Sequence, residues 1–512
     1  MDTKAEAAPT RGLLLGLCLV LGGSLAVCAS LNYLLTPMLS DLGLTSEEGS
    51  IALAIPSVGS LLIVFVAARL GDQRGHRRVL TWLAGLFVVG SALVGIAEGM
   101  PALVVGLLLT GVAGTGMQIV VIGMLSQRFP QPQSRAAAFG TIGMVSPVIW
   151  LAFPVLTGLI VEGHSWRWVP MAWALAGALA LIAARRLLPV DDRTAAAGDL
   201  WTPLLAGTVV AVGVQALSRA NSSGLTDPIT VLWIVVAVVA ALSCAWRLRR
   251  VASPGFSLLP LRRPPARLLL LVVVLIPVFN TIFFMTIAFQ YLYGLSVLGT
   301  ALAMVPAQAA AAVGTRVIAA PLMRTRGTHR TAVLLLLFLI PSLLTGFAVN
   351  AESPLWVPIV YVTLINVLLV SVSISITSAV MATVPTESGQ MSAYRGSAQS
   401  LGAVLAVVVM NTVVFTFSRL GMTDEFQDQG LTQSQADSLL TQIQTSSTSP
   451  SVMGQYYSVP LPSGTQVSDV MSGAIATGIH LNALLGVLLT LGSIVLVRRA
   501  DRAGAAASAV AD

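Results

Sequence analysis

Long apolar runs follow one another through the sequence, with polar connections between them. A helix needs about 20 apolar residues to cross about 30 Å of hydrocarbon. Backbone groups in lipid must be satisfied within their own segment, which favours helices. The pattern therefore predicts an all-α integral membrane protein with fourteen transmembrane helices. The runs lie at about residues 12–35, 50–68, 79–97, 102–126, 136–161, 168–188, 201–218, 229–246, 268–292, 298–323, 332–349, 355–381, 392–418 and 474–497, and the pair 201–218 and 229–246 is nearest the length limit.

The composition agrees with this pattern. Hydrophobic residues make up 56% of the 512 residues, charged residues only 10%, and the mean hydropathy is +0.87. A soluble protein of this length could not cover its surface with so few charges. We therefore exclude a soluble protein.

The basic residues fall mostly on one side of the predicted membrane. If the N-terminus is cytoplasmic, nearly all of the 28 lysines and arginines lie in the cytoplasmic connections and the two tails. The other side holds only Arg167, Arg219 and Arg419, and Arg316 lies within a run. This distribution follows the positive-inside rule and predicts that both termini are cytoplasmic. Because the charge is dispersed over short loops, a nucleic-acid partner is not expected.

The few cysteines and lysines carry limited information. Cys18, Cys28 and Cys244 all lie in apolar runs, so we expect no disulfide framework and no metal site. Residues 12–35 continue past Cys28 without a suitable cleavage site, and we interpret them as a retained first span. The only lysine is Lys4, among many arginines and alanines, a bias typical of high-GC bacteria. The expected location is the bacterial inner membrane.

Two basic connections recur at equivalent places in the chain. The first is Arg69–Leu80 (RLGDQRGHRRVL), and the second is the partial echo Leu322–Arg330 (LMRTRGTHR). Such internal repetition is typical of transporter folds. It predicts a six-helix bundle in residues 1–190, two inserted helices with their connectors in 191–266, and a second six-helix bundle in 267–512.

The connection 419–473 is long, polar and predicted to be extracytoplasmic. Within it, Thr432-Gln433-Ser434-Gln435 matches a capping box for a short amphipathic helix that would run to about Gln444. Two interpretations remain open for this loop. It is either a solvated loop with partial order or a lid over an outer vestibule, since loops of this length are often functional.

The first basic connection resembles a loop of the major facilitator superfamily, the loop between its second and third spans. That pattern is Gly, three residues, Asp, a basic residue, any residue, Gly, any residue, then two basic residues. Ala68 and Gln73 stand where the family has a Gly and a basic residue. The residues that match are Asp72, Gly75, Arg77 and Arg78.

Other segments resemble the fourteen-span drug:proton antiporter branch of that family. They are the Trp-Arg-Trp of Trp166–Trp168, then Gln290–Leu292, Val305-Pro306, Val384-Pro385 and Gly389. The resemblance covers nearly the whole chain. It implies a major facilitator fold with a six, two, six arrangement of helices.

The resemblance also implies a gate at the first basic connection. Asp72 would pair with Arg77, Arg78 or Arg135, or face a neighbouring helix N-terminus, and would close the cytoplasmic side in one state. Gly71 and Gly75 would allow close approach of the backbone. The alternative is that these arginines only set the orientation in the membrane. The predicted gating residues are Gly71, Asp72, Arg74, Gly75, Arg77 and Arg78.

The carboxylate that proton-driven relatives carry in their first span is missing. Aligning on Pro37 places Cys28 or Ala29 at that position. No Asp or Glu lies in the interior of any of the fourteen runs. A proton relay needs a group that changes protonation during the cycle. Proton coupling is therefore expected from the family but not supported by these residues.

Two further family motifs are reduced. The fourth span lacks the usual Arg, since its region reads Leu107–Gly111 (LLLTG). The antiporter signature of the fifth span survives only as Pro154 and Gly158.

Arg316 and His480 are titratable or charged residues that lie within runs. His480 could titrate near neutral pH, or simply form a hydrogen bond near the membrane interface. Arg316 would either extend to the cytoplasm or face the central cavity as a group that attracts anions.

A central cavity would lie between the bundles, lined by amides and aromatic rings. Amides are costly in lipid, so they should face protein or water, and each could also hold helices together. Such a cavity suits bulky, mostly apolar ligands that are neutral or weakly charged. The candidate substrate-binding residues are Asn32, Gln118, Trp150, Asn280, Phe284, Gln290, Arg316 and Asn366.

These features predict an exporter of amphipathic small molecules, such as drugs or metabolites, that works by alternating access. The partners are the small-molecule substrate, the lipid bilayer and, as the family implies, protons. We expect a monomer with no cofactor and no enzymatic activity. Three alternatives remain open: a lipid or lipophilic-metabolite exporter, an uncoupled facilitator, and a transport-inactive membrane sensor or scaffold.

Overall fold

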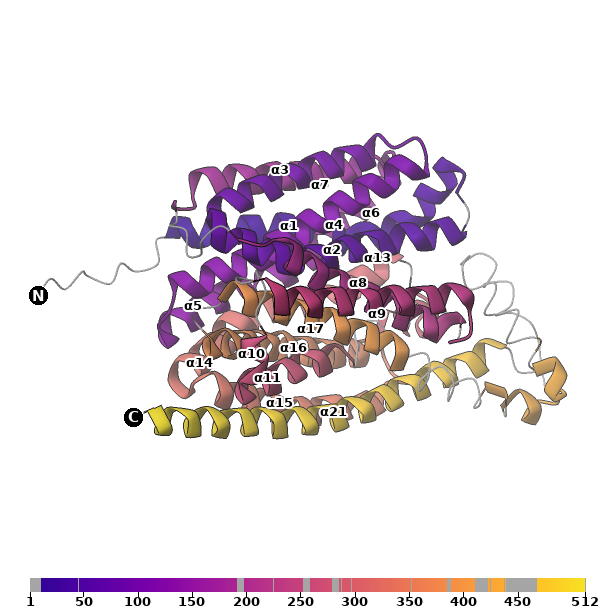
Figure 1. Ribbon diagram of the computed structural model, residues 1–512. Helices are drawn as coiled ribbons and strands as arrows, with labels where there is room; N and C mark the ends of the chain where they lie inside the picture. Colours follow the sequence, from indigo (N-terminus) through magenta and orange to yellow (C-terminus); the bar gives the residue numbers. More distant parts are fainter. Residues whose placement is uncertain are drawn as a thin grey trace, which may run out of the picture.

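The computed structural model shows a bundle of long helices that run roughly along one direction (Figure 1). All regular structure in the described residues is helical. The structure describes residues 11–44, 46–190, 198–223, 225–251, 258–278, 285–286, 288–295, 297–350, 352–384, 388–409, 422–423, 425–436, 438 and 467–511.

The first half of the chain forms one set of packed helices. Its helices are α1 (Arg11–Leu42), α2 (Ser46–Arg74), α3 (His76–Gly95), α4 (Met100–Arg128), α5 (Pro132–Gly143), α6 (Val145–Gly163) and α7 (Trp168–Arg186). Helix α2 packs on α4, α3 packs on α4 and α7, and α1 packs on α6 and α7. Trp173 is fully buried in this core, and its Nε1 donates to Ser30 Oγ at 2.7 Å. A buried tryptophan stabilises the core best when its N–H has such a partner.

The second half forms a second set that shares an interface with the first. Its helices are α10 (Leu259–Arg262), α11 (Pro264–Leu275), η1 (Ile276–Val278), η2 (Ala288–Leu292), α13 (Val297–Gly314), η3 (Thr315–Ala319), α14 (Ala320–Arg326), α15 (Thr328–Leu344), η4 (Thr345–Ala348), α16 (Trp356–Thr383), α17 (Ser388–Val409) and α21 (Val467–Ala511). Helix α16 packs on α13 and α15, while α21 packs on α11 and α15.

Two apolar runs that the sequence presents as single helices are interrupted. The run 136–161 divides at Met144 into α5 and α6. The run 298–323 passes through the π-helical turn η3 between α13 and α14. Such turns commonly mark functional sites in helices. Both interruptions lie where the two halves meet, since α5 packs on η3 and α14.

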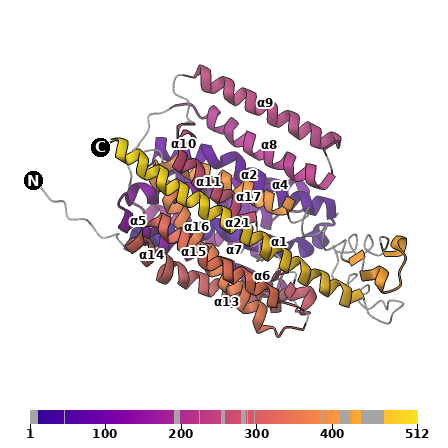
Figure 2. The ribbon, with the colours of Figure 1, turned by 90° about the horizontal axis from the view of Figure 1, so that it is seen from below.

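Helices α8 (Trp201–Ser223) and α9 (Pro228–Arg250) form an inserted hairpin at one side of the bundle (Figure 2). Helix α8 packs on α2, and a Cβ at Gly207 would collide with the Leu62 carbonyl oxygen. Asp199 pairs with Arg247 at 2.9 Å and ties the two ends of the hairpin together. Burial alone raises the pKa of Asp199, but hydrogen bonds from Thr202, the Trp201 amide and Arg247 outweigh it and lower that pKa.

Eleven helices of the described chain are long and apolar enough to cross a membrane. Two shorter apolar helices, Trp201–Leu217 and Pro264–Val278, fall below that length. The protein is therefore a multi-pass membrane protein, while the expected count of fourteen spans is not reached by the described residues alone.

The turns between helices define two ends of the bundle. We call the basic end the one that holds the α2–α3, α4–α5 and α14–α15 turns and the arginines at the end of α7. It lies at the left in Figure 1, where α5, α14 and the C-terminus are found. The opposite end holds Asp41 and the α6–α7 turn.

The capping box predicted in the long loop is partly described. The Thr432 amide donates to Gln435 Oε1 at 2.9 Å, and residues 433–436 are helical. Ser438 is also helical, and the other residues of the expected helix, to Gln444, lie outside the described residues.

Candidate transport path and gate

The two basic turns have the same backbone structure. Gly75 and Gly327 adopt φ values of 86° and 79°. Each donates its amide to the residue four positions earlier, at 3.0 Å for Gly75 and 3.1 Å for Gly327. Only glycine adopts this conformation without a steric cost. The echo seen in the sequence is therefore a structural repeat.

Asp72 lies under the first turn, with its side chain 14% exposed. Gln127 Nε2, from α4, donates to Asp72 Oδ1 at 3.4 Å. His76 Nε2 lies 3.9 Å from the same oxygen. The carboxylate is thus placed between α2, α3 and α4.

The arginines of the first turn contact neighbouring groups. Arg77 Nη2 donates to the Arg185 carbonyl at 2.6 Å and so ties α3 to the end of α7. The guanidinium carbons of Arg74 and Arg78 lie 5.4 and 6.0 Å from the centroid of the Trp82 ring. Cations over an aromatic face are stabilised there.

The structure refines two details of the predicted gate, namely the role of Gly71 and the contacts of Arg135. A Cβ at Gly71 would meet the His76 ring at 3.4 Å, which is ordinary contact, so close approach does not require glycine there. Arg135 donates to the carbonyls of Phe129 and Pro130, at 3.1 and 2.6 Å, and so braces the α4–α5 turn.

The two halves contact each other near the basic end through α17, which packs on α2 and α4. Ser392 Oγ donates to the Ile119 carbonyl at 2.9 Å, and both residues are buried. The rings of Phe65 and Tyr394 meet edge to face, with centroids 5.4 Å apart. These contacts hold this end of the interface together.

A second contact between the halves joins α5 to η3 and α14. A Cβ at Gly140 would lie 2.5 Å from the Cβ of Ala320, so the helices approach very closely here. Arg316 Nη1 donates to Thr141 Oγ1 at 2.7 Å. Arg316 was expected to extend to the cytoplasm or to face a cavity. Its described contact bridges the two halves, and the residue is exposed.

Arg395 is a charged residue inside a helix, and it was not among the predicted site residues. The positive-inside count treats it as part of a connection, but it lies within α17, two turns from its start. Its Nε donates to Thr377 Oγ1 of α16 at 2.8 Å. The signal was present in the sequence, because an arginine inside the run 392–418 is costly in lipid unless it faces water or a partner.

The candidate substrate-binding residues are only partly described. Gln118 is half-buried on α4, and Trp150 is 42% exposed on α6. Asn280 and Phe284 lie outside the described residues, as do the side chains of Asn32 and Gln290.

Asn366 makes a contact between helices. It is 2% exposed, and its Nδ2 donates to the Ala307 carbonyl at 3.0 Å and to Gln308 Oε1 at 3.3 Å. These bonds hold α16 against α13, as expected of an amide that serves helix packing. In this conformation Asn366 is not open to a ligand.

The Trp-Arg-Trp segment ties helix ends together at the opposite end. Trp166 Nε1 and Arg167 Nη2 both bond to Asp41 Oδ2, at 2.9 and 3.0 Å. Arg167 also donates to the Ala97 carbonyl at 2.6 Å. One arginine thus joins α1 and the end of α3 to the start of α7.

Two other predicted features also lie near the opposite end. His480 Nε2 lies 3.2 Å from the Val349 carbonyl, and its ring stacks on Phe347 with centroids 5.0 Å apart. This arrangement agrees with a hydrogen-bonded residue rather than a coupling group. Pro154 is buried within α6, and a Cβ at Gly158 would meet open space.

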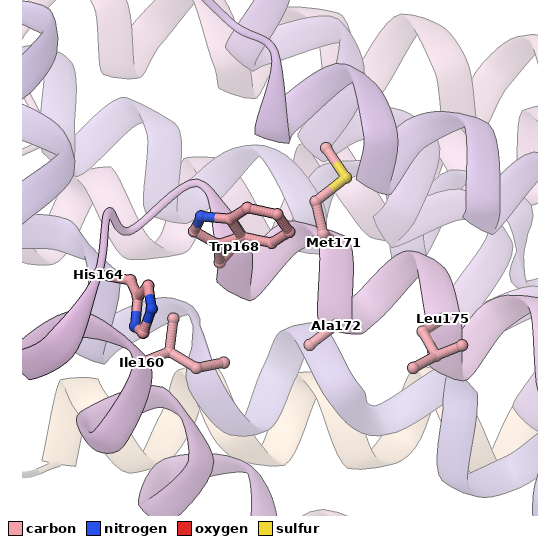
Figure 3. A pocket seen from close by; sticks show the side chains of 6 residues that line it. All are labelled: Ile160, His164, Trp168, Met171, Ala172 and Leu175. Atoms are coloured by element: carbon pink, nitrogen blue, oxygen red, sulfur yellow. The ribbon is translucent and has the colours of Figure 1, made fainter.

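Among the surface pockets of the described residues, two lie within one half each. The first is an apolar cavity of about 470 Å³ between α6 and α7, with His164 and Trp168 at one end and Leu175 at the other (Figure 3). The second lies between α15 and α21 at the basic end. Within the described chain, no group of three His, Cys, Asp or Glu residues could hold a metal ion.

Two helical bundles that meet across a shared interface, with repeated basic turns at one end, define a membrane transporter. The model of the Major Facilitator Superfamily matches residues 13–407. The chain therefore belongs to that family.

Its relatives include antibiotic resistance proteins. The chain is 30% identical over 420 residues to the puromycin resistance protein of Streptomyces alboniger, covering 78% of this chain and 81% of that protein. It is 28% identical over 375 residues to the tetracenomycin C resistance and export protein of Streptomyces glaucescens, covering 72% and 68%.

Solved structures show the same fold. The human organic anion transporter MFSD10 aligns with a TM-score of 0.58 at 17% identity, over 80% of this chain and 94% of that one. The proton:xylose symporter XylE aligns with a TM-score of 0.57 at 12% identity, over 93% of each chain.

Proposed function

We propose that this protein exports bulky amphipathic small molecules from the bacterial cytoplasm by alternating access. The observation that carries the proposal is the match to export and resistance proteins over most of the chain. Fourteen spans in a six, two, six arrangement, with both termini and the basic end in the cytoplasm, complete the proposal. The inserted hairpin α8–α9 lies at the side, and the substrate passes between the two bundles.

The contacts at the basic end form the cytoplasmic gate. For substrate to enter from the cytoplasm, α17 must leave α2 and α4, and α5 must leave α14. The Ser392–Ile119 and Arg316–Thr141 hydrogen bonds must then break. Asp72 and Gln127 join α2 to α4 within the first bundle and so support the surface on which α17 packs when the gate is closed.

The charges along the path favour neutral or acidic substrates. Arg316 and Arg395 lie within the second bundle, and the interiors of the apolar runs contain no carboxylate. A cationic substrate would meet like charge in a region of low dielectric constant, where repulsion is strong. A proton-coupled transporter needs a group that binds and releases a proton, and this group is usually a carboxylate. The absence of carboxylates from the run interiors therefore supports a second candidate, a facilitator that is not coupled to protons.

Transport into inside-out membrane vesicles tests this proposal. A panel of acidic, neutral and cationic amphipathic compounds would be presented with and without an imposed proton gradient, and vesicles without the protein would serve as the control. We expect uptake of neutral or acidic compounds, and uptake that survives collapse of the gradient would support the uncoupled facilitator. Uptake restricted to cations would contradict the substrate class, and loss of uptake with the gradient would contradict the uncoupled mechanism. No uptake of any compound would contradict export itself.

A further inference from the structure

The pocket between α15 and α21 has a basic rim. It has a volume of about 530 Å³ and lies at the basic end, within the second bundle. Its charged lining residues are Arg326, His329, Arg330, Arg498 and Asp501. Three arginines against one aspartate leave the rim positively charged whatever the state of the histidine.

The one carboxylate of the rim is largely turned to water. Asp501 is 56% exposed, and its Oδ1 lies 3.8 Å from His329 Nδ1. His329 Nε2 is buried and has no hydrogen-bond partner in the described structure. The three arginines of the rim can therefore pair with an anion, while the Nε2 atom of His329 is buried and not open to the pocket.

The wall of the pocket below the rim is apolar. Val333, Leu334 and Leu337 continue along α15 from Arg330 toward the middle of the bundle, at spacings that place them on one helix face. Leu337 is 43% exposed. A ligand with a charged head and a hydrocarbon chain would match both parts of the pocket.

The pocket lies away from the contacts between the two halves. Those contacts involve α2, α4, α5 and α6 of the first half and α13, η3, α14, α16 and α17 of the second, whereas α15 and α21 form one edge of the bundle (Figure 1). A transported substrate would not need to pass here. The ends of transmembrane helices lie at the level of the lipid phosphates, and basic pockets between helices there bind anionic head groups.

We propose that this pocket binds an anionic phospholipid of the cytoplasmic leaflet. The phosphate lies among Arg326, Arg330 and Arg498, and an acyl chain lies along Leu334 and Leu337. The assignment to the cytoplasmic leaflet rests on the proposed function, in which the basic end faces the cytoplasm. The binding itself depends only on the pocket and is measured without transport.

Binding would be measured on the purified full-length protein in detergent. Phosphatidylglycerol, phosphatidylcholine and inorganic phosphate would be titrated, with native mass spectrometry for bound lipid and thermal unfolding for stability. We expect binding and stabilisation by phosphatidylglycerol at concentrations where the other two have little effect. Equal effects of the two lipids would overturn the proposal. Saturation by inorganic phosphate alone would show a simple anion site and would also overturn it.

Variants of the rim residues test whether the lipid binds in this pocket. The double variant R330Q/R498Q should bind phosphatidylglycerol about 30-fold more weakly, since each arginine near a lipid surface contributes about 1 kcal/mol. The control R249Q/R250Q removes the same charge from the exposed end of α9 and should bind normally. Asp501→Asn removes the opposing charge and should bind several-fold more tightly, which tests the site even if the double variant folds poorly. Equal binding by all three variants would overturn the assignment.

Discussion

The two basic turns share a backbone but differ in the side chains around it. Both place a glycine with positive φ between two helices, and both form the same hydrogen bonds. Three residues before that glycine, the first turn has Asp72 and the second has Arg324. Asp72 faces α4, while the second turn leads into the pocket beside α21. The two turns thus have the same backbone conformation, but the side chains of the first lie at the proposed gate and those of the second lie beside a membrane-facing pocket.

The largest expected difference between the turns concerns transport. Asp72→Asn should slow transport roughly tenfold, because a hydrogen bond to a charged group contributes about 1.5–3 kcal/mol and the α2–α4 surface that receives α17 would lose part of it. Arg324→Gln, at the same position of the second turn, should transport nearly as well as the unaltered protein. Both rates would be measured in vesicles at matched protein levels.

Folding must be checked for this pair by size-exclusion chromatography. Equal rates for Asp72→Asn and the unaltered protein would remove the gate role from the first turn. An equally large loss in Arg324→Gln would show that the two turns act alike.

Replacing the glycine of either turn should lower the stability of the protein by the same amount, and this effect is smaller than the effect on transport. Gly75→Ala and Gly327→Ala should each lower the free energy of unfolding by about 1–2 kcal/mol, because a side chain in the left-handed region clashes with the backbone. Thermal unfolding in detergent would measure it. Gly85→Ala is the control, since Gly85 lies within α3 and a Cβ there meets open space. If only one turn is sensitive, the two turns are not structural equivalents.

The apolar pattern predicts much of the fold because each membrane-crossing helix carries its own signal. The runs 79–97 and 102–126 correspond closely to α3 and α4. Helix α21 continues to Ala511, well past its run, because its alanine-rich end favours helix outside an apolar setting. The interruption at Met144 and the π-helical turn η3 depend on how the halves pack, which the pattern does not contain.

The candidate site could be predicted less well. Gly75 was predicted from its match to the family pattern, and its φ of 86° gives the physical reason for a glycine at that position. Asn366 was a candidate for substrate binding or for helix packing, because an amide in a run looks the same in both roles, and in this conformation it holds α16 to α13. Arg395 lies near the start of the run 392–418 and could equally belong to the preceding connection, and its hydrogen bond to Thr377 places it between α17 and α16.

The central claim is that the two halves must separate at the basic end during each cycle. Cysteines at Gly140 and Ala320, in a protein whose Cys18, Cys28 and Cys244 are replaced, would place two thiols where a Cβ on Gly140 lies 2.5 Å from that of Ala320. Disulfides need about 3.5–4.5 Å between Cβ atoms, so a small relaxation of α5 from α14 suffices. The deciding measurement is vesicle transport by this variant before oxidation, after oxidation and after reduction, with each single-cysteine variant as control. Oxidation should abolish transport and reduction should restore it, whereas undiminished transport by the cross-linked protein would contradict the account.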